Sequence, residues 1–178
     1  MSLPTHITVG SDCQTATGRV LAGISTPFNT LLNRSIPDLA ARFRAGTLAR
    51  DEWTHEAHLA VVLVACREEP TEDAVLKRMR ADIKRYNDRN GIENGPRSGY
   101  HETLTCFWVR AVASFAQQHS GPLAEVFPLL LEVGGNARTP LRFGRRARSW
   151  MRRREPTWVE PDLRPLPFDA TNANPGAL

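Results

Sequence analysis

The sequence predicts an all-α protein, and three observations support this fold class. Apolar residues recur at spacings of three and four over most of 50–133, and no alternating strand pattern occurs beyond a short stretch at 7–9. Glycine, proline and asparagine separate the periodic segments. The loops between these segments are short, which favours an up-down bundle of four main helices. An extended segment rich in proline and arginine is expected after the bundle.

The main helices are predicted at about 50–68, 72–89, 99–118 and 123–133. Thr71, followed by two acidic residues, is typical of a helix start, and Asn90-Gly91 is typical of a helix end. A short helix is expected over 37–46, with Pro37 at its first turn, and another around 142–153.

A chain of 178 residues is long enough for one domain with its own core. We expect a poorly ordered N-terminal arm over 1–36, a helical bundle over 37–168 and a disordered tail over 169–178. The three cysteines are odd in number and widely spaced, and no secretory signal or membrane span is visible. These features predict a cytoplasmic protein that makes no membrane contact.

The positive charge is local. The segment Arg138–Arg154 holds eight arginines and no acid, whereas the rest of the chain carries 15 basic and 19 acidic residues. Without a basic face on the main helices, nucleic-acid binding is disfavoured, and the segment is more typical of a partner-binding tail. The sequence also lacks a glycine-rich phosphate loop, a Gly-x-Ser-x-Gly elbow and a Cys-x-x-Cys pair.

The residues most suited to metal binding or catalysis gather in two short stretches, 53–59 and 99–103. They hold three of the five histidines, each in the first turns of an apolar predicted helix: His55, His58 and His101. If the helices run up, down and up, the starts of the first and third and the end of the second lie at one level. The sequence therefore predicts that the three imidazoles converge in one pocket.

Three imidazoles and a carboxylate suit a divalent transition metal, with zinc and iron as the leading candidates. We expect His55, His58 and His101 to bind the metal, with Glu102 or Glu56 as a further ligand or as the general base. The activity would be hydrolytic or oxygen-dependent on a small molecule. The two neighbouring histidines are one residue too close for the zinc-protease motif.

Further residues complete the candidate site. Tyr100 is a candidate catalytic residue, and Tyr86 and Asn87 are candidate contacts to a cofactor or ligand. Both tyrosines also suit packing roles with their hydroxyls hydrogen-bonded. Separately, Glu52-x-x-His55 has the spacing used in di-iron bundles, but the sequence contains only one copy of it. A non-catalytic hypothesis stays open, in which the histidine cluster fixes the bundle and the arginine-rich segment binds a partner.

Several motifs resemble a family of small uncharacterised bacterial helical proteins. The motifs are Trp53-Thr54-His55-x-Ala57-His58-Leu59, Arg85-Tyr86-Asn87, Gly99-Tyr100-His101-Glu102-Thr103 and the closing stretch 158–167. The resemblance covers roughly 39–168 and leaves out the N-terminal arm. It implies the extent of the domain and adds weight to the histidine motifs, but it implies no activity.

Overall fold

The structure is a computed structural model that describes residues 26–95, 98–144, 157–160, 162–163 and 166. These residues form five α-helices and one short 3-10 helix: α1 (Thr26–Ala45), α2 (His55–Glu68), α3 (Glu72–Arg89), α4 (Glu102–Gln118), α5 (Leu123–Gly134) and η1 (Thr139–Arg142). Within the described part of the chain there is no β-strand, so the predicted all-α class is confirmed. None of the described helices is both long and apolar enough to cross a membrane.

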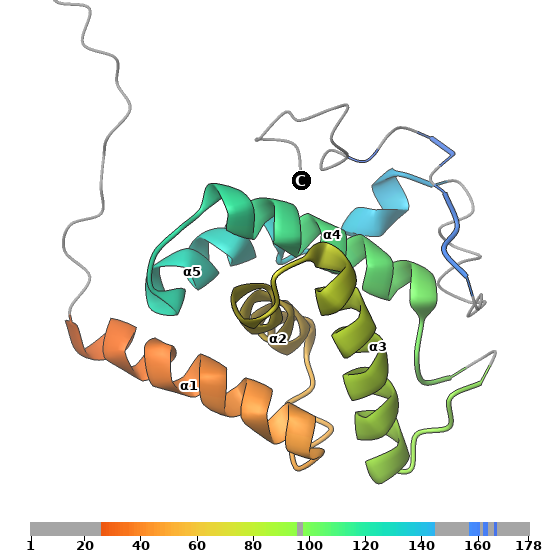
Figure 1. The fold of residues 1–178 in the computed structure, drawn as a ribbon, viewed down its shortest axis with the longest axis horizontal. Coiled ribbons are helices and arrows are strands. Elements are labelled where there is room, and N and C mark those ends of the chain that lie inside the picture. The colour runs from red at the N-terminus through yellow and green to blue at the C-terminus, as the bar shows by residue number, and fades with distance from the viewer. Residues whose placement is uncertain (1–25, 96–97, 145–156, 161, 164–165, 167–178) are drawn as a thin grey trace, which may run out of the picture.

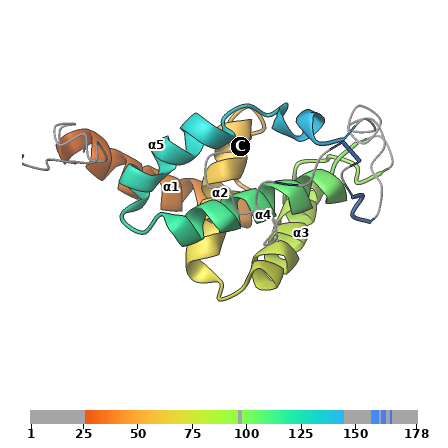
Figure 2. The ribbon, with the colours of Figure 1, turned by 90° about the horizontal axis from the view of Figure 1, so that it is seen from above.

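The helix α2 lies at the centre of the fold. Ala57 and every residue from Leu59 to Ala65 are buried, so α2 is apolar on all sides and needs neighbours on all sides. It packs against α1, α3, α4 and α5. Figure 1 looks nearly along α2, whereas α1 and α4 run across the view, and Figure 2 shows α2 upright across them. The predicted up-down arrangement of four helices is therefore not confirmed, because α2 crosses α1 and α4.

Local capping sets where the helices begin. The helix α2 starts at His55, later than predicted, because the Thr54 side chain accepts a hydrogen bond from the Ala57 N–H and residues just before it form turns. In the same way α4 starts at Glu102, where the His101 side chain caps the Leu104 N–H. The helix α3 has the bounds that the sequence predicts.

The first helix is longer than predicted. It starts at Thr26 and continues through Pro37, which therefore does not begin the helix, and its first residues fall in the region expected to be a poorly ordered arm. Ile36, Ala40 and Phe43 are buried at spacings of four and three, which places one face of α1 against the core. Residues 1–25 and 167–178 lie outside the described part, so the expectations for the arm before Thr26 and for the tail remain predictions.

The described C-terminal residues lie against α4. Leu166 is buried with Phe107 and Phe143, and Trp158 packs against the same cluster. Leu163 is 45% exposed. Of the arginine-rich segment, the structure describes residues 138–144 alone, so the predicted helix over 142–153 lies mainly outside the described residues.

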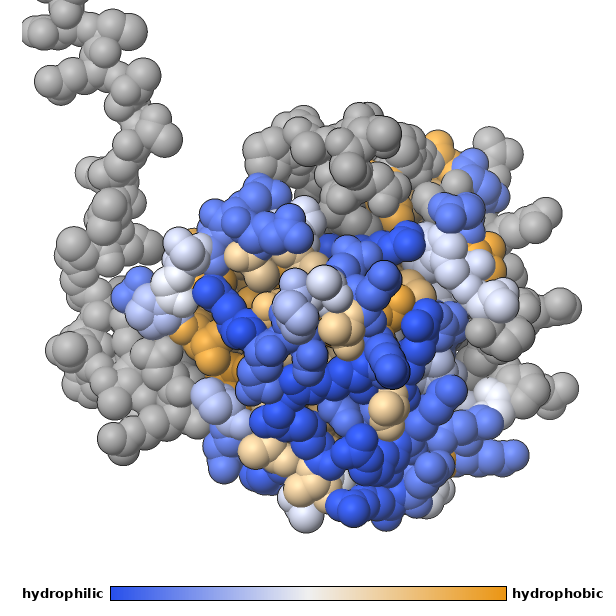
Figure 3. All heavy atoms as spheres, in the orientation of Figure 1, coloured by the Kyte–Doolittle hydropathy of each residue, from blue (hydrophilic) through white to orange (hydrophobic). Residues whose placement is uncertain are grey.

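The outer face of α3 is polar, which directs its apolar face toward α2 and α4. Figure 3 shows mainly hydrophilic side chains over this part of the surface. Arg78 bonds to Glu68 at 2.6 Å and to Glu69 at 2.9 Å. On the opposite face, Val75 and Met79 are buried in the core. This orientation places the inner surface of α3 along a cavity.

Candidate functional site

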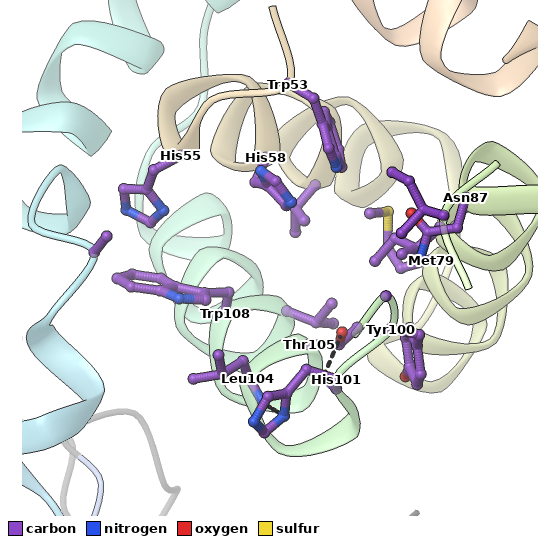
Figure 4. Close-up of a pocket in the computed structure, with 16 residues that line it drawn as sticks. Trp53, His55, His58, Met79, Asn87, Tyr100, His101, Leu104, Thr105 and Trp108 are labelled. Atoms are coloured by element: carbon purple, nitrogen blue, oxygen red, sulfur yellow. Dashed lines mark hydrogen bonds between the residues drawn. The ribbon is translucent and has the colours of Figure 1, made fainter. Parts of the chain in front are cut away.

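A cavity of about 500 Å³ lies between α2, α3 and α4, and residues of the connection from α3 to α4 complete its wall (Figure 4). Its apolar lining residues are Trp53, Val62, Met79, Ile83, Ile92, Leu104, Trp108, Val109 and Ala137, with Gly99 at the rim. Its polar lining residues are His55, His58, Asn87, Tyr100, His101 and Thr105. Among the described residues, no aspartate, glutamate, lysine or arginine lines it. Volume and composition are typical of a small-molecule site.

His58 lies in the first turns of α2 and directs its ring into the cavity (Figure 4). Its Nδ1 is 2.6 Å from the Thr54 carbonyl oxygen, and its ring stacks on Trp53 with the centroids 3.6 Å apart. Burial lowers the pKa of His58 to about 4, although the Thr54 carbonyl opposes the shift. The imidazole is therefore neutral at pH 7. Because a carbonyl only accepts, Nδ1 carries the proton and Nε2 keeps a free lone pair.

A chain of amides orients Asn87 at the end of α3. Asp88 accepts a hydrogen bond from Nδ2 of Asn94, which leaves Oδ1 of Asn94 to accept from the Tyr100 N–H and from Nδ2 of Asn87. These bonds fix which end of the Asn87 amide is the oxygen. Asn87 is only 4% exposed, and its Oδ1 has no partner among the described residues. Asn87 therefore presents a buried acceptor to the cavity.

His55 and His101 use their rings for backbone contacts. Nε2 of His55 is 2.9 Å from the Gly134 carbonyl oxygen, so this nitrogen donates and ties the start of α2 to the end of α5. The His55 ring also lies against Trp108, with centroids 4.7 Å apart. Nδ1 of His101 accepts from the Leu104 N–H at 3.4 Å. Each of these histidines therefore has a structural role at a helix start.

The three histidines share one cavity but not one metal position. Figure 4 shows His55 and His58 on the α2 wall and His101 at the start of α4, on another wall. Within the described residues, which include all three, no group of three or more His, Cys, Asp or Glu side chains is placed to hold a metal ion. The described side chains do not supply the ligand set of the zinc or iron site that the sequence predicts, so that site remains a prediction.

No family model, curated protein or solved structure matches this chain. Fold class alone does not specify chemistry. The functional conclusion therefore rests on the residues of the cavity and on their surroundings.

Glu102 lies behind the cavity, and its buried carboxylate pairs with the partly exposed Arg80. Arg80 donates to it from Nε at 3.0 Å and from a second nitrogen, the Tyr100 hydroxyl donates at 2.5 Å, and the Cys106 thiol lies 3.1 Å away. Burial would raise the pKa of Glu102, but the bonds from Arg80, Tyr100 and Cys106 outweigh it and lower the pKa to about 2. This carboxylate is ionised and paired, and it is not among the residues that line the cavity.

The Tyr100 ring lines the cavity, whereas its hydroxyl is committed to Glu102. Burial and the adjacent Glu102 carboxylate raise the pKa of Tyr100, so the hydroxyl keeps its proton at neutral pH. In this arrangement Tyr100 forms part of a wall and holds no reactive oxygen toward the cavity. The bond from the Tyr100 hydroxyl to Glu102 therefore holds this part of the cavity wall against α4.

Two other predicted site residues lie away from the cavity. Glu56 is exposed, and the Thr54 hydroxyl lowers the pKa of Glu56. Tyr86 is fully buried; its hydroxyl donates to the Ala49 carbonyl at 3.4 Å, and its ring packs beside Phe43. Neither residue lines the cavity.

Sequence reasoning missed several residues of the site. Trp53 and Trp108 look like core residues in the sequence, yet both line the cavity. Asn94 lies in a polar loop with two helix breakers and orients Asn87 through its own amide. The available signal for Asn94 was an amide in a loop next to a histidine motif, which is too common to single out one residue.

Proposed function

We propose that this protein binds a small organic molecule in the cavity between α2, α3 and α4. The observation that carries the proposal is the buried Oδ1 of Asn87, which has no partner among the described residues and lines a cavity of about 500 Å³. A buried polar group without a partner costs free energy. A ligand that donates to this oxygen removes that cost.

The walls supply the rest of the binding free energy. Burying an apolar ligand surface contributes about 25 cal/mol per Å², and Trp53, Trp108 and Leu104 offer wide apolar contacts. The wall is also held in place before a ligand arrives. Trp53 stacks on Phe43 with centroids 4.1 Å apart, and Tyr100 is bonded to Glu102. Little conformational entropy is lost when walls of this kind bind a ligand.

The other functions that the sequence predicts have less support. A metal-dependent reaction requires a ligand set, and the described residues present none. A partner-binding role for Arg138–Arg154 concerns a segment that lies mainly outside the described residues. The cavity and its unsatisfied acceptor therefore support ligand binding best.

The proposal is tested by titrating the ¹⁵N-labelled full chain with 2-naphthol, an uncharged bicyclic aromatic with one hydroxyl donor, and following the backbone amide resonances. Saturable shifts are expected at Leu104, Thr105 and Ile83, which line the cavity. The variant Leu104→Trp reduces the cavity volume and should weaken binding. Leu129→Trp is the matched control, because Leu129 is 42% exposed on α5 and does not line the cavity. Shifts spread over the surface, unaffected by Leu104→Trp, would contradict the proposal.

A further inference from the structure

We infer that the ligand of this cavity is an uncharged molecule with an apolar body that donates an N–H or O–H hydrogen bond to Nε2 of His58. The inference rests on the proposed binding function and specifies the class of ligand. It follows from the proton on the imidazole, the absence of charged side chains among the described lining residues and the position of Asn87.

The acceptor character of His58 is fixed by the backbone of its own helix. The Thr54 carbonyl oxygen is 2.6 Å from Nδ1 and can only accept, so the neutral ring carries its proton on Nδ1. Nε2 then holds a lone pair, and the ring enters the cavity from α2 (Figure 4). The stack on Trp53 fixes the plane of the ring, and the bond from Nδ1 to Thr54 fixes which edge of the ring faces the cavity. A ligand group that meets Nε2 must therefore donate.

The residues that line the cavity disfavour binding of a charged ligand. None of the sixteen described residues that line the cavity is an acid, a lysine or an arginine. The nearby carboxylate of Glu102 is already paired with Arg80 and bonded to Tyr100. An ionic ligand would gain no counter-charge from these residues in return for the hydration that it loses, which is strongly unfavourable. An uncharged donor meets no such cost.

Asn87 supports the same class of ligand from another wall. Its Nδ2 is engaged with Asn94 at 2.8 Å, so its Oδ1 is the atom that remains to accept. Nε2 of His58 on α2 and Oδ1 of Asn87 on α3 are therefore both acceptors. Between them lie Met79 and Ile83 from α3 and Val62 from α2, which suit an apolar body.

The test compares two probes of the same shape, indole and benzofuran. Both are uncharged bicyclic aromatics, but only indole has an N–H donor. Each is titrated at pH 7.5 into the full-length wild-type protein, His58→Phe and His119→Phe, and dissociation constants are obtained from amide shifts. The Phe variants keep an aromatic ring and remove the nitrogens.

His119 is a close structural match for His58 outside the cavity. Its Nδ1 is 2.9 Å from the Phe115 carbonyl oxygen, four residues earlier, as Nδ1 of His58 is bonded to Thr54. Its ring stacks on Phe115 with centroids 3.9 Å apart. Substituting His119 therefore controls for the loss of a stacked imidazole at a helix backbone.

Wild type and His119→Phe should bind indole about three- to tenfold more tightly than benzofuran, the value of one hydrogen bond. In His58→Phe the two affinities should become equal through weaker indole binding. Equal affinities in wild type would overturn the ligand class, and a preference for indole that persists in His58→Phe would overturn the bond to His58; both results leave the proposed function standing. If neither probe binds, the proposed function fails as well.

A second measurement covers the case in which His58→Phe does not fold. In the wild-type protein with ¹⁵N-labelled histidine, the Nε2 resonance of His58 should move on adding indole and stay nearly unchanged on adding benzofuran. An Nε2 resonance that indole leaves in place would overturn the inference without any variant.

Discussion

The imidazole of His58 lies on the indole of Trp53, with ring centroids 3.6 Å apart and ring planes 29° from parallel. Trp53 in turn stacks on Phe43 of α1. This column of rings connects the first helix to the cavity. It also shields one face of His58 from water, which contributes to the burial that lowers the pKa of His58.

Replacing Trp53 by Ala should therefore raise the pKa of His58 from about 4 toward its ordinary value of 6.5. The same change should lower the free energy of unfolding by about 3 kcal/mol, since large aromatic contacts are lost. The pKa is measured by NMR titration of the imidazole carbon-bound protons, and the stability by urea unfolding. The resonance of His119 is the internal control, because it stacks on Phe115 and not on Trp53. An unchanged His58 pKa would show that the stack does not shield the ring.

His58 should also make the protein less stable in mild acid. Its pKa is about 4 in the folded chain and 6.5 ordinarily, so the unfolded chain binds more protons between these values. Stability should therefore fall as the pH drops from 6.5 to 4, by roughly 3 kcal/mol for the full shift. Urea unfolding across this range measures the effect. His58→Phe should lose this slope, whereas the contribution of Glu102, whose folded pKa is about 2, should fall away only below about pH 4.5.

Removing the buried carboxylate should destabilise the rim of the cavity. Glu102→Gln leaves Arg80 and the Tyr100 hydroxyl without an ionised acceptor. We expect the free energy of unfolding to fall by about 2 kcal/mol, at the low end for a broken buried pair, because the Arg80 side chain is 41% exposed and can turn to water. In the exposed pair of Glu72 with Arg110, Glu72→Gln should cost less than about 1 kcal/mol. Equal losses in the two variants would argue against the Glu102 cluster as a fixed element.

His101 distinguishes a metal ligand from a helix cap. His101→Ala removes the side chain that accepts from the Leu104 N–H, so we expect a loss of about 1 kcal/mol in stability. Because the three histidines form no metal-binding group, the metal content of protein purified without chelator should be the same in wild type, His55→Ala and His101→Ala. Elemental analysis measures this. Near one metal per chain, lost in both variants, would restore the metal hypothesis.

Features that depend on neighbouring residues could be predicted closely. Thr71 caps α3 by accepting from the Ala74 N–H, and the helix ends at Arg89 as Asn90-Gly91 indicates. Capping involves residues within one turn, so the sequence carries it directly. The starts of α2 and α4 were less well predicted, because Thr54 and His101 cap these helices after residues that themselves look helical.

The placement of the histidines in one cavity does not depend on the up-down arrangement that suggested it. The turn between α2 and α3 is short, and α3 ends where the connection to α4 begins, so the start of α2, the end of α3 and the start of α4 all border the cavity. Tyr86 and Asn87 are adjacent in sequence, yet only Asn87 lines it. Successive residues of a helix point in different directions, and the packing of α3 decided which one faces inward.

The sequence by itself determined the helical class, the bounds of α3 and the presence of imidazoles at two helix starts, because periodicity and capping act over a few residues. Only the tertiary structure decided what those imidazoles do. Nε2 of His55 is bonded to a carbonyl 79 residues away, at Gly134, whereas Nε2 of His58 faces an apolar cavity. The bond to Thr54 that leaves the lone pair on Nε2 of His58 is local, but the partner of His55 and the cavity that His58 faces come from packing and not from spacing.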